Sequence, residues 1–327
     1  MTRTGVESEA VKRLLRGVED DDVKDILVRC LTGIISPSVG LMQLLIHTED
    51  AAAVRGAVDE VTRRAAFLSR SGDNLLRDRV DDLTQLVVEN EPGCARIAEM
   101  LRSSMDSPEP APTVEEGIAF CERLFDWSVQ QSEEASVALY SLGNPDLLER
   151  ATREIIVQLE RWGILSPEKT VLDIGCGIGR LEIELASRVK AVHGIDVSNQ
   201  MIKAALRRCA PLPNVHLIKG TGRDLGEYQD GEFDAVIAVD TFPYINQAGR
   251  ALVDRYFSEA ARVLKPGGDF VILNFSYWSD DAADISAIGR LATKYSFDQV
   301  TVGERPLALW DGLAFHLRKR GNAPNLS

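Results

Sequence analysis

Apolar side chains recur every three or four residues over the first hundred positions, which is the spacing of helices that bury one face. The most regular stripe consists of Val23, Ile26, Leu27, Cys30, Leu31 and Ile34. A second helix is expected to begin after Ser36, an N-cap residue, with Pro37 in the first turn, where its missing N–H group costs nothing. Its buried face is expected to contain Met42, Leu45 and Ile46.

Three further periodic runs, at 52–68, 74–88 and 95–102, are separated by turn-forming segments at 71–73 and 91–93. The alternating pattern of half-buried strands is absent from this part of the sequence. We therefore expect an all-helical N-terminal domain over residues 1–105. Residues 106–113 combine three prolines with small polar residues, the composition of an extended linker.

Beyond the linker the pattern changes twice. Helical spacing returns at 114–127 and 147–162, so residues 114–165 are expected to form a helical cap over the active site. From 166 to 320, short apolar strands alternate with helices, and the expected strands are 170–174, 191–195, 215–218, 233–239, 269–275, 298–303 and 312–318. This alternation predicts an α/β fold with a doubly wound, mainly parallel seven-stranded sheet, followed by a flexible tail at 321–327.

Charge and composition narrow the set of partners. The 37 basic and 50 acidic residues give a net charge of −13, which repels polyanions and argues against a nucleic acid partner. No apolar run reaches the roughly 20 residues of a membrane-spanning helix, and the first ten residues lack a secretory signal, so we expect a cytoplasmic protein. Five scattered cysteines and four scattered histidines predict neither disulfides nor a metal site.

The motif that carries chemistry is D-x-G-x-G-x-G, where the first predicted strand ends and a helix begins. It contains Asp173, Gly175, Gly177 and Gly179. Glycines at alternate positions let the main chain turn sharply and approach a ligand without an intervening Cβ. The dinucleotide fingerprint G-x-G-x-x-G does not fit, because Arg180 or Glu182 would occupy its third glycine position.

Three further landmarks follow in order. Asp196 ends the second strand, where an acidic residue in nucleotide-binding α/β folds accepts hydrogen bonds from ribose hydroxyls. FDAVIAVD at 233–240 and RVLKPGG at 262–268 come next. With these motifs, residues 115–320 resemble the class I S-adenosylmethionine-dependent methyltransferases, a Rossmann-like family of small-molecule enzymes. The resemblance implies S-adenosylmethionine as the cofactor.

The resemblance also implies which residues hold that cofactor. They are Asp173, Gly175, Cys176, Gly177, Gly179, Asp196, Val197, Met201 and Asp240. The family's usual acidic residue at the adenine is absent at Thr221, so Asp224 or the main chain of Gly222 and Arg223 is expected to contact the base.

The resemblance further implies methyl transfer to an N, O, S or C nucleophile of a small molecule, with secondary metabolism as one setting. The candidate catalytic residues are Asp240, Tyr140 and Tyr244, and the candidate substrate-binding residues are Asn144, Phe242, Tyr277 and Trp278. No histidine lies between His216 and His316, where many O-methyltransferases place a base. We therefore favour a neutral amine, a thiolate, or an acidic oxygen or carbon as the acceptor.

Two other functions share these motifs. The cofactor's amino acid tail could cyclise or be transferred, releasing methylthioadenosine, or the protein could be a non-catalytic cofactor-binding regulator. The helical first third carries no motif for chemistry. We expect it to form a homodimer by burying apolar surface; a lid or a docking surface for a partner protein are the alternatives.

Overall fold

The computed structural model describes residues 9–67, 74–103, 113–277 and 279–321. Packing divides the chain into two units. The first contains Met1–Ser104, Gln131–Ala151 and Ala308–Asp311, and the second contains Met105–Gln130, Thr152–Leu307 and Gly312–Ser327. The predicted turn at 71–73, most of the linker and most of the C-terminal tail lie outside the described residues.

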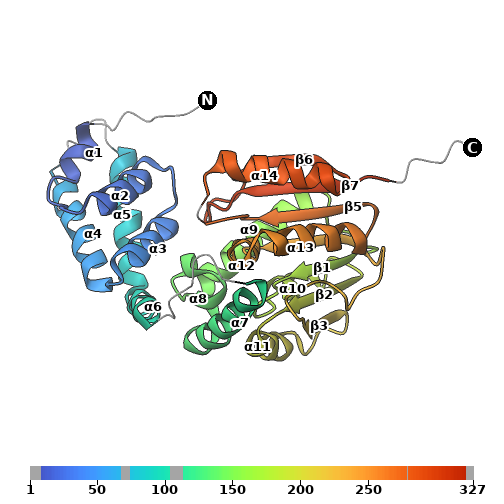
Figure 1. The fold of residues 1–327 in the computed structure, drawn as a ribbon. Helices are drawn as coiled ribbons and strands as arrows, with labels where there is room; N and C mark the ends of the chain where they lie inside the picture. The colour runs from blue at the N-terminus through green and yellow to red at the C-terminus, as the bar shows by residue number, and fades with distance from the viewer. Residues whose placement is uncertain (1–8, 68–73, 104–112, 278, 322–327) are drawn as a thin grey trace, which may run out of the picture. The chain divides into compact units, whose positions relative to one another are not determined.

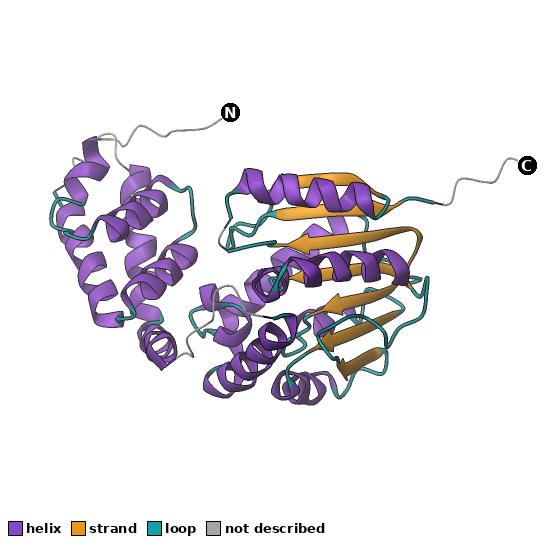
Figure 2. Ribbon diagram, in the orientation of Figure 1, coloured by secondary structure: helices purple, strands orange, loops and turns teal. Residues whose placement is uncertain are grey.

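The first unit is helical, as Figures 1 and 2 show. Its helices are α1 (Glu9–Leu14), α2 (Asp21–Thr32), α3 (Pro37–Thr48), α4 (Ala51–Ala65), α5 (Asn74–Glu89), α6 (Glu91–Ser103), α8 (Glu133–Val137), the 3-10 helix η1 (Leu139–Ser141) and the start of α9 (Pro145–Arg161). Among the described residues, no helix is both long and apolar enough to cross a membrane.

The central element of this unit is α3, which contacts α2, α4, α5, α6 and η1. Its predicted start is confirmed, since the Val39 amide donates to Ser36 Oγ at 3.2 Å. The predicted buried face is shifted: Leu41, Leu44 and Leu45 are buried, whereas Ile46 is 45% exposed.

The stripe of the preceding helix also ends earlier than expected. Ile34 is 58% exposed, because Gly33 caps α2 in the left-handed conformation and turns the chain away before Ile34.

The predicted turn at 91–93 is wrong, because these residues form the first turn of α6. Pro92 is tolerated there since the first helical amides have no partner within the helix. Gly93 is needed for a packing reason instead: a Cβ at this position would collide with the main-chain oxygen of Leu142.

The predicted cap at 114–165 is not one body. Its first helix, α7 (Val114–Gln131), belongs almost wholly to the second unit, while Gln131–Ala151 belongs to the first. Helix α9 begins in the first unit and continues in the second. Sequence periodicity finds helices but does not show which core each one joins.

The second unit contains a seven-stranded sheet in the order β3-β2-β1-β4-β5-β7-β6, and the predicted fold class is confirmed. The strands are β1 (Thr170–Ile174), β2 (Ala191–Asp196), β3 (Val215–Lys219), β4 (Phe233–Val239), β5 (Leu264–Leu273), β6 (Phe297–Glu304) and β7 (Ala314–Lys319). The first five are parallel, and β7 is antiparallel to both of its neighbours.

Strand β5 begins five residues before the predicted start at 269 and ends two residues before the predicted end. Leu264 pairs with Phe233 and Asp269 with Ala235, so residues 265–268 form a bulge opposite Asp234. Gly267, with φ of +79°, permits the bulge, and Lys265 Nζ bonds both carboxylate oxygens of Asp234 at 2.8 Å.

Helices cover both faces of the sheet in Figure 1. Helices α10 (Arg180–Leu185) and α11 (Asn199–Cys209) pack on β2 and β3. Helix α13 (Arg250–Val263) packs on β5, and α14 (Asp281–Lys294) packs on β6. The order of the strands reverses between β1 and β4, and ligands of such sheets bind at the carboxyl ends of the strands at this reversal.

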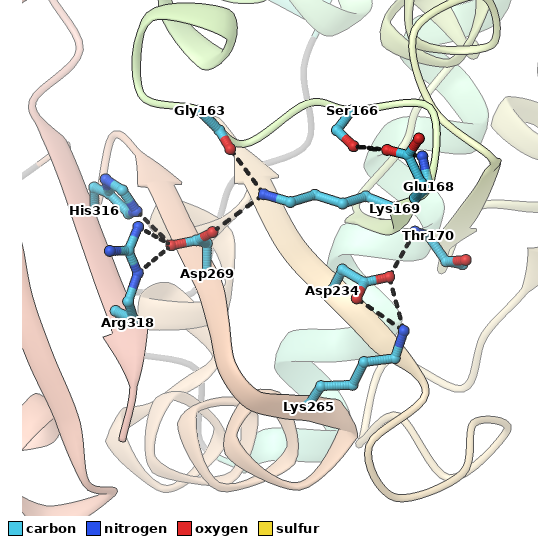
Figure 3. Close-up of polar contacts among 10 residues, drawn as sticks. All are labelled: Gly163, Ser166, Glu168, Lys169, Thr170, Asp234, Lys265, Asp269, His316 and Arg318. Carbon is cyan, nitrogen blue, oxygen red and sulfur yellow. Dashed lines mark hydrogen bonds and ion pairs between the residues drawn. The ribbon is translucent and has the colours of Figure 1, made fainter. Parts of the chain in front are cut away.

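At the other end of the strands, where β1, β4 and β5 begin, the sheet is held by the ion-pair network in Figure 3. Asp269 Oδ1 accepts hydrogen bonds from His316 Nε2 at 2.9 Å and from Arg318, while Lys169 Nζ lies 3.6 Å from Oδ2. Burial opposes ionisation of Asp269, but these partners outweigh it and lower the pKa of the carboxyl. The carboxylate thus links β5 to β7 and to the start of β1.

Replacing Asp269 with Asn should lower the free energy of unfolding by about 3 kcal/mol, because it removes one charge from a buried group of partners. The wild-type contribution should be lost as pH falls from about 4 through the lowered pKa. Urea unfolding monitored by circular dichroism measures both effects. Asp298→Asn is the control, since that carboxylate is exposed beside Arg320 and should matter by less than about 1 kcal/mol.

Candidate functional site

The loop between β1 and α10 is shaped by three glycines with left-handed backbones. The φ angles of Gly175, Gly177 and Gly179 are +77°, +55° and +78°. The Gly175 amide donates to the Ile195 carbonyl at 2.7 Å, which fixes the loop to the end of β2. A Cβ on Gly175 would collide with the side chain of Thr241, which follows β4. The close approach of this segment to the loop therefore requires glycine at position 175.

Asp196 lies beside this loop at the end of β2. Its carboxylate accepts hydrogen bonds from the Gly177 amide at 2.9 Å and the Ser198 amide at 2.8 Å. Burial and the nearby Asp126 raise the pKa of Asp196, the two amides counteract them, and the pKa is about 6. Asp196 is therefore mostly ionised at neutral pH and available to hydroxyl donors.

Helix α7 supplies residues that sequence reasoning missed. Asp126 Oδ1 accepts from Ser198 Oγ at 2.6 Å and from the Gln200 amide at 2.9 Å, so it holds the start of α11. Ile118 and Phe125 also reach the site, as described below. They stand seven residues apart on one helical face, a signal that could have found them but that also describes ordinary core packing.

Apolar side chains pack closely on the main chain of Gly222. A Cβ on Gly222 would lie 2.8 Å from Ile118 and 3.1 Å from Val197, so this close packing requires glycine. Met201 is buried at the start of α11. The side chains around Gly222 and Met201 are apolar, as a flat apolar ring would require of its neighbours.

The two side chains expected near a base edge lie elsewhere. Asp224 accepts from the Gly226 amide at 3.2 Å and pairs with Arg255 at 3.2 Å, so its carboxylate is already engaged. Arg223 is exposed, with its guanidinium 3.9 Å from Glu115. The main chain of Gly222 is the member of this predicted group that packs against Ile118 and Val197.

Asp240 follows β4 and lies at the reversal point of the sheet. Its backbone is left-handed, with φ of +58°, and its amide donates to the Leu273 carbonyl at 2.8 Å. Asn274 Nδ2 donates to Asp240 Oδ1 at 2.8 Å. Strained non-glycine backbones of this kind cluster at functional sites.

Aromatic rings surround this carboxylate. Tyr277 is hydrogen-bonded to Asp240 and to Tyr244. The Tyr244 ring packs edge-on against Tyr277 at 5.8 Å and against Phe125 at 4.7 Å between centroids. Loss of water around the hydroxyl group and the charge of Asp240 raise the pKa of both tyrosines, although the Tyr277 side chain as a whole is 45% exposed, so both phenols are protonated at neutral pH. Tyr244, a predicted base, is therefore a hydrogen-bond donor.

Among the remaining candidates, Phe242 lies in the core and not in this cluster. Phe242 is fully buried in the core, with its ring 5.7 Å from those of Phe257 and Phe275. Tyr140 and Asn144 belong to the first unit. Tyr140 is 2% exposed and stacks on Trp310, whereas Asn144 caps α9 and bonds Asn90. Trp278 lies outside the described residues.

Asp173 and Cys176 lie beneath the loop rather than on its surface. Both are buried, and burial raises the pKa of Asp173 to about 8 and that of the Cys176 thiol well above its ordinary value. Cys176 is consequently an uncharged side chain that packs under the loop and is not a nucleophile.

Comparison with known proteins agrees with this geometry. Residues 171–268 match a family described as a methyltransferase domain. A demethylmenaquinone methyltransferase of Tropheryma whipplei is 35% identical over 115 residues, which are 35% of this chain and 45% of that protein. The corresponding protein of Symbiobacterium thermophilum is 32% identical over 171 residues, covering 50% of this chain and 62% of its own length.

Among solved structures, a SAM-dependent methyltransferase of Aquifex aeolicus is 20% identical with a TM-score of 0.41, covering 54% of this chain and 92% of its own. The chain spans about half the length of the curated relatives described above.

Gly175→Ala should destabilise the protein more than Gly267→Ala. Both glycines have nearly the same φ, +77° and +79°, but a Cβ on Gly267 would meet no atom within 4 Å. The Gly267 variant should lose about 1 kcal/mol from backbone strain, and the Gly175 variant about 2 kcal/mol more from the collision with Thr241. Equal losses in urea unfolding would show that the loop does not need this close approach.

Proposed function

We propose that this chain binds S-adenosylmethionine and transfers its methyl group to a small molecule, because residues 171–268 match a family described as a methyltransferase domain. The observation that carries the proposal is the pairing of the left-handed glycine loop with the ionised Asp196. A non-catalytic regulator has no need for a carboxylate on a strained backbone, such as that of Asp240, or for the aromatic rings around it.

The residues present fit this cofactor. Asp196 accepts the ribose hydroxyls, and the apolar side chains of Ile118 and Val197 beside Gly222 lie against the adenine ring. The loop from Gly175 to Gly179 has no Cβ atoms at alternate positions, so its main chain can approach the ligand. Asp240 supplies negative charge for a sulfonium cation.

Bound S-adenosylmethionine supplies an electrophilic methyl group. The chain's contribution is to orient the acceptor and to manage its proton. Asp240 is the candidate base, because Asn274 and Tyr277 orient its carboxylate and the tyrosines nearby are protonated. Tyr244 and Tyr277 donate hydrogen bonds and, with Phe125, offer ring edges and faces to the acceptor.

A small organic molecule is the acceptor class we propose. Support comes from relatives named demethylmenaquinone methyltransferase and phosphoethanolamine N-methyltransferase, the latter of Caenorhabditis elegans and 30% identical over 128 residues.

We also propose a homodimer formed through the helices of the first unit. It is supported by the apolar side chains that the first unit exposes on its helices and the adjoining turns, which include Ile34, Ile46, Phe67 and Leu75.

Asp196→Asn should weaken binding of S-adenosylmethionine and S-adenosylhomocysteine equally, by about tenfold, because both ligands share the ribose and the variant loses a charge-assisted hydrogen bond. Wild-type affinity should also fall as pH drops through about 6, where the carboxylate takes up a proton. Calorimetric titration measures both. Absence of binding to the wild-type chain at pH 7 would refute the proposed function.

Asp240→Asn should discriminate between the same two ligands. The cationic S-adenosylmethionine should lose about fivefold more affinity than the uncharged thioether product, because a nearby carboxylate attracts the sulfonium by about 1 kcal/mol. Asp196→Asn serves as the matched control, since it should leave the ratio of the two affinities unchanged. An unchanged ratio in the Asp240 variant would place its carboxylate away from the sulfur.

The reaction itself is tested by incubating the chain with S-adenosylmethionine and the low-mass fraction of a cell extract. Methyl transfer releases S-adenosylhomocysteine, which mass spectrometry separates from methylthioadenosine. Release of methylthioadenosine would assign the chain to chemistry of the cofactor's amino acid tail.

A further inference from the structure

Two buried carboxyl groups face each other beneath the glycine loop. Asp173, at the end of β1, is 1% exposed, and Glu182, in the first turn of α10, is 0% exposed. The two side chains are in hydrogen-bonding contact. They stand on either side of the loop 175–179 in sequence, so their contact joins the residue before the loop to the helix after it.

The sheet is built to receive the glutamate. Gly194 of β2 pairs with Asp173 of β1, so these residues lie side by side. A Cβ on Gly194 would lie 2.7 Å from Glu182 Oε1, and the missing side chain therefore leaves the space that the carboxyl group fills. The fit of the Glu182 carboxyl group against Gly194 therefore sets its position.

Hydrogen-bond donors are missing around this contact. Apart from the Glu182 amide, which favours ionisation of its own side chain, no group in the described part of the chain donates to Asp173 Oδ1 or to the oxygens of Glu182, although all three atoms are buried. Arg180 is the nearby cation, and its Nη1 donates to Thr152 Oγ1 at 3.1 Å. Two ionised carboxylates in contact without donors would repel each other strongly, so the pair requires a proton between its oxygens.

We propose that Glu182 is a positioning residue: it keeps its proton at neutral pH, donates it in a hydrogen bond to the Asp173 carboxyl group, and thereby holds the glycine loop in the shape that binds the cofactor. The inference rests on the proposed function, because cofactor affinity is the property it explains.

The surroundings favour the protonated form. Asp196 from β2 and the neutral thiols of Cys176 and Cys209 face the pair, and among the described residues Arg180 is the cation that opposes them. Burial, followed by repulsion from Asp173, raises the pKa of Glu182 well above its ordinary value. The pair should therefore lose its proton only in the alkaline range, and the loop should loosen there.

The test is calorimetric binding of S-adenosylhomocysteine between pH 7 and 9.5 to the full chain and to Glu182→Gln. The amide can still donate to Asp173 but cannot lose a proton at these pH values. Above the pH at which the pair titrates, wild-type affinity should fall relative to Glu182→Gln by about tenfold per pH unit. Taking the ratio cancels the titration of the ligand's own amino group.

Two further variants separate this role from mere space filling. Glu182→Leu fills the volume without a donor and should bind more weakly than Glu182→Gln at every pH. Glu184→Gln, on the same helix and paired with Arg188, should follow the wild-type profile. Parallel profiles for the wild type and Glu182→Gln, or tighter wild-type binding at high pH, would overturn the proposal.

An infrared measurement on the wild-type chain tests the proposal even if Glu182→Gln does not fold. The wild-type chain should show the carbonyl band of a protonated carboxylic acid at pH 7, and the band should vanish at alkaline pH. Its absence at pH 7 would overturn the proposal. Failure of the wild type to bind S-adenosylhomocysteine at pH 7 would instead refute the proposed function and leave the infrared result to decide about the proton.

Discussion

The hydrogen bond from the Gly177 amide to the Asp196 carboxylate connects the loop after β1 with the end of β2, and the rest of the site is arranged around it. It requires a left-handed backbone, which glycine adopts without penalty. The same carboxylate accepts from the Ser198 amide, so one side chain sets both the loop and the start of α11.

Acidic groups outnumber basic ones around this loop. Asp126, Asp173, Asp196 and Asp240 all lie at the carboxyl ends of the strands or against them, and Arg180 is a described cation that acts on Asp173. A partly buried site of this sign has a negative potential that water screens poorly. Such a potential suits a cationic ligand and disfavours a pyrophosphate, in agreement with the failure of the dinucleotide spacing.

The sheet and the loop could be predicted because continuous apolar strands and alternate glycines are local signals. Asp240 was found by its place after a strand. The role of α7 could not be found, since Phe125 and Asp126 reach the site only after the helix packs. Tyr140 could not be placed for the same reason: its environment depends on Trp310, 170 residues later in the chain. In the sequence, Glu182 is distinguished only by occupying a position where the dinucleotide fingerprint would require glycine.

The first unit is discontinuous, and this affects how a new chain folds on the ribosome. Ser36 and Ser38 donate to the Leu309 carbonyl at 3.0 and 3.1 Å, and Tyr140 stacks on Trp310. These partners are made near the end of synthesis, after nearly the whole sheet has emerged. The N-terminal helices therefore cannot complete their contacts until residues 308–311 have been synthesised. A prematurely terminated chain would expose the apolar surface that Trp310 covers.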